Sequence, residues 1–80
     1  MAIYIEINKK YEDKQVVIYI YSPSGKRSGE LLIHKHNFEL CSILSAEGEE
    51  DDFYVLRAWS AIRKYYSRDG QFPETACYAA

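Results

Sequence analysis

The stretch that decides the fold is EEDDFYVLRAWSAIRKYYSR, residues 49–68. Its apolar side chains recur at steps of three and four residues and form one stripe: Val55, Ala58, Trp59, Ile62, Tyr65 and Tyr66. This spacing is typical of an amphipathic helix with one buried face. Acidic residues crowd the start and basic residues the end, as the helix dipole favours, and Gly70 follows at a capping position. The sequence therefore predicts a helix over 49–68 that packs its stripe against another layer.

Upstream of this helix, apolar residues alternate with the period of two that is typical of strands. We predict strands over residues 2–8, 15–21 and 28–36, with a turn at Ser22-Pro23-Ser24-Gly25 between the last two. Residues 37–45 are ambiguous, because they alternate like a strand while Asn37 could cap a helical turn; we favour the strand. The connections are too short for crossover helices, so the sheet is expected to be antiparallel.

The expected fold class is α+β: a three- or four-stranded antiparallel sheet packed on one C-terminal amphipathic helix. The 80 residues suit a single domain spanning 1–80. After the helix we expect an ordered C-terminal tail, because Phe72, Cys77 and Tyr78 would be costly to leave in water.

The net charge and the absence of recognisable targeting signals exclude few classes of function. The formal net charge is −2, but five of the twelve acidic residues fall within 47–52. The opening residues do not resemble a signal peptide, and no stretch approaches the ~20 apolar residues of a membrane span. We therefore expect a cytosolic location without membrane association, where thiols stay reduced. Cys41 and Cys77 are expected to be small buried hydrophobic residues, with a disulfide or a reactive thiol as alternatives.

Two histidines are the weak candidates for metal binding. His34 and His36 share one face of a strand, so both imidazoles could reach one ion. A zinc site needs three or four ligands, and no spacing specifies Cys41 or a carboxylate as the next one. A Cys41–histidine nucleophile would also need a pocket, which so short a chain offers poorly. We expect no metal, no cofactor and no enzymatic activity.

Two polar runs resemble known sites only superficially. Residues 24–28, Ser-Gly-Lys-Arg-Ser, lack the upstream glycine and the context of a phosphate-binding loop, so we interpret them as a hairpin turn. The acidic run 47–52 lacks the ligand spacing of a calcium loop. It is interpreted as a complement to the helix dipole, or as a docking patch for a basic partner.

The tyrosines give the main functional hypothesis. There are eight, and one helix covers only one face of a sheet. We expect Ile3, Ile5, Ile7, Val16, Ile18 and Ile20 to face the helix, which leaves Tyr4, Val17, Tyr19 and Tyr21 on the other face. The third strand would add either Leu32, His34 and His36 or Leu31, Ile33 and Lys35 to that face. Tyrosine is enriched at interfaces, and an acidic patch can steer a basic partner. The predicted partner-binding residues are therefore Tyr4, Tyr19, Tyr21, Glu49, Glu50, Asp51 and Asp52. The alternative is that the tail covers this face with Phe72 and Tyr78.

These observations favour a small non-enzymatic protein-interaction domain that occludes a protein partner, which would be basic. An immunity or inhibitor-type protein is the class-level hypothesis. The main rival is a single-stranded nucleic-acid-binding sheet platform, in which Tyr19 and Tyr21 stack bases while Lys26, Arg27 and Lys35 hold phosphates. The few cations and the negative net charge make nucleic acid the less favoured partner. A homodimer that associates through its sheet faces is the third hypothesis.

Overall fold

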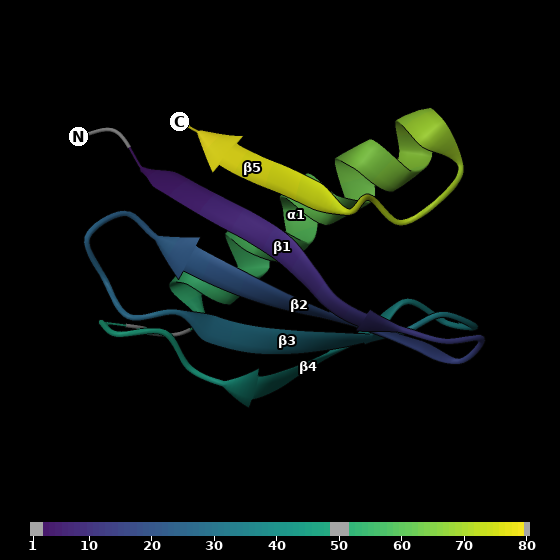
Figure 1. Cartoon of the computed structure of the whole chain (residues 1–80), viewed down its shortest axis with the longest axis horizontal. Coiled ribbons are helices and arrows are strands. Elements are labelled where there is room, and N and C mark those ends of the chain that lie inside the picture. Colours follow the sequence, from purple (N-terminus) through teal and green to yellow (C-terminus); the bar gives the residue numbers. More distant parts are fainter. Residues whose placement is uncertain (1–2, 49–51, 80) are drawn as a thin grey trace.

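The computed structural model describes residues 3–48 and 52–79, and these form a five-stranded sheet with one helix across it. The elements are β1 (Tyr4–Glu12), β2 (Val16–Pro23), β3 (Gly29–His34), β4 (Glu39–Leu44), α1 (Phe53–Asp69) and β5 (Thr75–Ala79). All neighbouring strands are antiparallel, in the order β4-β3-β2-β1-β5. Figure 1 shows α1 running diagonally behind the sheet, while no described element covers the front.

The α+β class and the antiparallel sheet are confirmed, and residues 39–44 form the favoured fourth strand. The prediction of a C-terminal helix is wrong, because α1 lies between β4 and a fifth strand. The expected tail pairs with β1, so that Tyr78 lies opposite Ile5 and Ala76 opposite Ile7. This pairing satisfies the backbone groups along an edge of β1 that would otherwise remain open.

The helix is shorter at its start than predicted. It begins at Phe53, and Asp52 precedes it as the N-cap with φ 58°, which breaks the helical path. Asp is one of the few residues other than Gly that visits this left-handed region readily. The predicted helical residues Glu49, Glu50 and Asp51 lie outside the described part of the chain. At the other end Gly70 has φ 76° and donates its backbone N–H to Tyr66 O at 2.8 Å, as the sequence predicts.

The core uses the opposite face of β2 from the one expected. Tyr19 and Tyr21 are fully buried with Val17, whereas the predicted core residues Val16, Ile18 and Ile20 lie on the face that α1 leaves uncovered. The register explains this, because Tyr21 lies opposite Ile7 and residues directly opposite share a face. The described core consists of Ile5, Ile7, Val17, Tyr19, Tyr21, Leu31, Ile33, Ala46, Val55, Ala58, Ala61, Ile62 and Phe72.

Two tyrosines enter the core because their hydroxyl groups find partners at its margin. The Tyr19 hydroxyl donates to Pro73 O at 2.6 Å, and the Tyr21 hydroxyl reaches Leu44 O at 3.5 Å. Burial without such partners would cost each phenol several kcal/mol, on the order of 2–4. Gly29 lies opposite Tyr21, and a Cβ added there would lie 2.5 Å from the tyrosine Cζ. A glycine across the strand thus makes room for the ring.

Candidate functional site

The uncovered face of the sheet, called the outer face below, carries an apolar row that crosses four strands. Tyr11 pairs with Ile18, Ile18 with Leu32, and Leu32 with Cys41. Leu44 lies in the next row and is 51% exposed, as is Tyr11. No described element covers this row, since α1 packs on the opposite face (Figure 1). An apolar row open to water is the typical signature of a surface that binds another molecule.

Acidic side chains flank this apolar row. Glu39 lies opposite His34 at one end, and Glu6 lies between Ser22 and Cys77 nearer the β5 edge. Glu30 is also on this face and forms an ion pair of 2.8 Å with Lys10. The outer face therefore combines exposed aliphatic groups with a margin that is richer in carboxylates than in cations.

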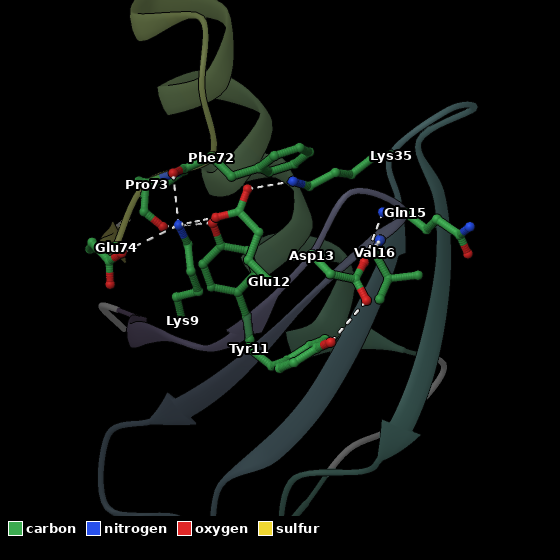
Figure 2. Close-up of polar contacts among 11 residues, drawn as sticks. Lys9, Tyr11, Glu12, Asp13, Gln15, Val16, Lys35, Phe72, Pro73 and Glu74 are labelled. Carbon is green, nitrogen blue, oxygen red and sulfur yellow. Dashed lines mark hydrogen bonds and ion pairs between the residues drawn. The ribbon is translucent and has the colours of Figure 1, made fainter.

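Tyr11 is held in place by its own strand end. Its hydroxyl donates to Asp13 Oδ2 at 2.9 Å, while Asp13 Oδ1 accepts the backbone N–H groups of Gln15 and Val16, each at 2.8 Å (Figure 2). The hydrogen bond and the charge of Asp13 raise the pKa of Tyr11 above its ordinary value of 10.0. The ring is thus positioned before any partner arrives, which lowers the entropic cost of binding.

The structure places only part of the predicted partner-binding set on a surface. Tyr4 lies on the outer face and is 45% exposed, as predicted. The expectation that Tyr19 and Tyr21 also lie there is wrong, because both are core residues with no exposed area. Asp52 is exposed, and Glu49, Glu50 and Asp51 lie outside the described residues. Sequence reasoning did not single out Tyr11; its place in a strand was hidden by the polar residues 8–14 around it.

The tail does not cover the outer face, contrary to the alternative considered above. It forms β5 and widens the sheet, while Phe72 is buried on the helix side. Of the two registers left open for the third strand, the one with Leu32 and His34 on the outer face is observed; Leu31 and Ile33 are buried. His36 follows β3 in the turn before β4.

The two cysteines are exposed, so the expectation of buried hydrophobic residues is wrong. Cys41 is in β4 and Cys77 in β5, at opposite edges of the sheet with three strands between them. Strands are spaced by about 4.8 Å, so this separation far exceeds the Cα–Cα span of a disulfide. Both thiols are free.

Cys41 and His34 are the one predicted pair of reactive types that the fold brings together. Cys41 Sγ lies 4.0 Å from His34 Nε2, and the His34 and His36 rings are 6.1 Å apart. Within residues 3–48 and 52–79, no group of three or more metal-ligating side chains is clustered. The pair sits on the uncovered face of the sheet, where Cys41 is exposed.

A polar network closes one end of the sheet beneath the loop after α1 (Figure 2). Lys9 Nζ pairs with Glu12 at 2.5 Å and Glu74 at 3.4 Å, and also donates to Phe72 O at 3.3 Å. Glu12 in turn accepts from Lys35 Nζ at 2.5 Å. The network fastens the 71–74 loop, from which Pro73 accepts the Tyr19 hydroxyl, to β1 and the β3–β4 turn. Its connections indicate a stabilising role rather than a binding role.

This network predicts an acid-sensitive contribution to stability. Hydrogen bonds from Lys35 and then Lys9 hold the pKa of Glu12 below its ordinary value of 4.5. A carboxyl whose pKa is lower in the folded state stabilises the fold above pH ~5, and that stability is lost as pH falls through the folded value. We expect Glu12→Gln to cost about 0.5–1 kcal/mol at pH 7 and progressively less below pH ~4. Urea unfolding across this pH range tests it, with the outer-face variant Glu6→Gln as control; an equal cost of Glu12→Gln at pH 7 and pH 3 would contradict it.

In the described part of the chain, no helix has the length and apolar character needed to cross a membrane. Comparisons of the chain with protein-family models, with curated proteins and with solved structures give no match.

Proposed function

We propose that this chain is a small non-enzymatic protein-interaction domain whose outer face binds a protein partner. The observation that carries the proposal is the cross-strand row Tyr11–Ile18–Leu32–Cys41, which no described element covers. A row of this kind supplies the apolar centre of an interface, and Leu44 extends it into the next row. Tyr4 adds a separate exposed ring farther along β1, beyond Asn8 and Glu6.

The partner is expected to present basic residues around an apolar centre. Glu6, Glu30 and Glu39 surround the row, and their charge complements lysine or arginine at the rim of a partner surface. Such a domain acts by occlusion, since a preformed sheet face can cover a cationic surface without any chemistry of its own. An immunity or inhibitor-type role fits this mode of action.

The test replaces Ile18 with Lys and Leu32 with Lys, singly and together. These side chains are on the outer face, so the fold should tolerate the change while a basic partner is repelled and loses its apolar contact. A chain with a photo-crosslinking residue in place of Tyr4 and no other change captures the partner. The captured protein is then purified, and its binding to the unlabelled chain and to each variant is measured by calorimetry. Each substitution should raise Kd about 10- to 100-fold, as expected for an interface centre.

The control is Lys26→Glu, which changes charge at an exposed position in the β2–β3 turn, away from the row. It should bind with a Kd close to that of the wild type. A partner that binds the Ile18→Lys, Leu32→Lys variant as tightly as the wild type would refute the proposal. Sedimentation of the chain alone provides a second check, because a dimer that these substitutions dissolve would identify a second copy as the occupant.

A further inference from the structure

The helix side of the molecule carries a groove that the outer-face proposal does not use. This groove, called the helix groove below, has a volume of about 850 Å³ and lies between α1 and Phe38 of the β3–β4 turn. It is lined by three aromatic rings, two cations and two hydroxyl groups: Phe38, Trp59, Tyr66, Arg63, Lys64, Ser60 and Ser67. A second hollow of about 530 Å³ shares Ser60 and Lys64 with it and adds Tyr65, Arg68 and Tyr78. Among the residues that the structure describes, no carboxylate lines either hollow.

The charge on α1 is almost entirely positive. The helix carries four basic residues and a single acidic one, Asp69, which pairs with Arg68 at 3.0 Å. Among the described residues, no carboxylate lies within ion-pair distance of Arg63 or Lys64. The chain as a whole has a net charge of −2, so the positive charge of the groove is confined to this surface. A surface of this charge complements an anionic ligand.

The cations of this surface lie next to aromatic rings. The Arg63 guanidinium is 5.6 Å from the centre of the Trp59 ring, and the Arg68 guanidinium is 4.8 Å from that of Tyr65. Each hollow therefore offers an aromatic ring and a positive charge, with Lys64 between the two. Each nucleotide of a single strand has a base that can stack on an aromatic ring and a phosphate that can pair with a cation.

Phe38 supplies the groove wall at a conformational cost. Its φ is 58°, a region that a bulky side chain seldom adopts. The ring is 38% exposed and packs 5.2 Å from Tyr66 and 6.4 Å from Trp59, measured between ring centres. Strain of this kind persists where the surroundings enforce it, and it concentrates at binding sites.

From this combination we infer that the helix groove binds single-stranded nucleic acid. Bases stack against the aromatic walls, and Arg63, Lys64 and the serine hydroxyl groups contact phosphates. An acidic peptide would satisfy the cations but would leave the aromatic walls without regular stacking partners. The platform on Tyr19 and Tyr21 considered from the sequence is a different surface, since those rings are buried. The helix groove is also on the opposite side of the sheet from the proposed protein-binding face.

The test is a titration of the purified chain with a fluorescein-labelled oligothymidylate of about 12 nucleotides at ~50 mM salt. Trp59 is the one tryptophan of the chain and lines the groove, so quenching of its fluorescence reports binding at this place. The double variant Arg63→Glu and Lys64→Glu should bind about tenfold or more weakly, and the slope of log K against log salt should fall by about 1.4. The matched control is Lys14→Glu with Lys26→Glu, which changes the net charge equally at exposed sites outside the groove. Circular dichroism verifies that both variants fold.

The titrations distinguish the possible ligands of the groove. Binding that quenches Trp59, is lost in the groove variant and is retained in the control supports the inference. The absence of binding at low salt overturns it, and so does an equal loss in both variants. Competition by polyglutamate as effective as that by unlabelled oligothymidylate overturns it in favour of an acidic protein ligand. None of these outcomes bears on the outer face, so the two proposals stand or fall separately.

Discussion

Tyr19→Ala should lower the free energy of unfolding by about 3–5 kcal/mol, because it removes a fully buried ring from the centre of the sheet. An 80-residue domain has roughly 4–12 kcal/mol of total stability, so this single change could unfold it. The loss combines a cavity among Leu31, Lys9 and the α1 side of the core with the loss of the hydrogen bond to Pro73 O. Urea unfolding followed by circular dichroism measures the effect.

Two further variants separate the causes. Tyr19→Phe keeps the ring and removes only the hydroxyl, so it should cost about 1 kcal/mol. Tyr11→Ala removes a tyrosine that is 51% exposed and should change the stability by less than about 1 kcal/mol. If Tyr19→Ala were as mild as Tyr11→Ala, Tyr19 could not occupy the core, and the observed register of β2 would be wrong.

Gly29→Ala should destabilise the domain by about 2–3 kcal/mol or more, although it adds only one methyl group. The new Cβ would lie 2.5 Å from Tyr21 Cζ and 2.6 Å from the backbone oxygen of Leu44. Neither neighbour can move freely, because Tyr21 is fully buried and Leu44 pairs with Glu30 in the β3–β4 ladder. Equilibrium unfolding in urea measures the cost.

A double-mutant cycle identifies the clash as the cause. Tyr21→Leu shortens the buried side chain, so Gly29→Ala should cost less in that background, with a coupling of about 1 kcal/mol. Gly25→Ala is the control for backbone strain without a clash, since Gly25 has φ +74° and no atom within 4 Å of an added Cβ. Strictly additive effects of Gly29→Ala and Tyr21→Leu would show that the ring and the glycine do not compete for space.

The sequence predicted the elements better than it predicted their faces. Apolar periodicity located α1 and four strands, because apolar residues recur at helical or strand spacing in each of them. In β2 both alternating sets are apolar, so periodicity alone could not choose between Ile18 and Tyr19 for the core. The choice was present in the next strand, where Glu30, His34 and His36 make one set polar. Even-numbered residues of β2 pair with even-numbered residues of β3, so both sets lie on the same face of the sheet. The polar even-numbered side chains of β3 therefore mark the solvent face and assign the odd-numbered Tyr19 and Tyr21 to the core.

Two other features had weaker signals. Strand β5 is short, and its alanine residues lack β-propensity, so only pairing with β1 makes it a strand. The helix groove depends on Phe38, a turn residue whose position beside Trp59 and Tyr66 follows from the tertiary fold alone. The helix was predicted to leave one face of the sheet uncovered, and no described element covers the outer face. Its side chains on β2 are aliphatic and not tyrosines, because β2 turns Tyr19 and Tyr21, and not Ile18 and Ile20, toward the helix.

The pairing of β5 with β1 has a consequence for how the chain reaches this structure. Tyr4 meets Ala79 across that ladder, so two segments that lie far apart in the sequence pair with each other. Contacts of such long sequence separation form slowly, because a large loop must close first. Until they form, the edge of β1 that β5 later covers offers unpaired backbone groups to other chains. Refolding at high protein concentration should therefore favour aggregation through β1. A chain without residues 75–79 should aggregate in this way even after folding, because its β1 edge stays unpaired.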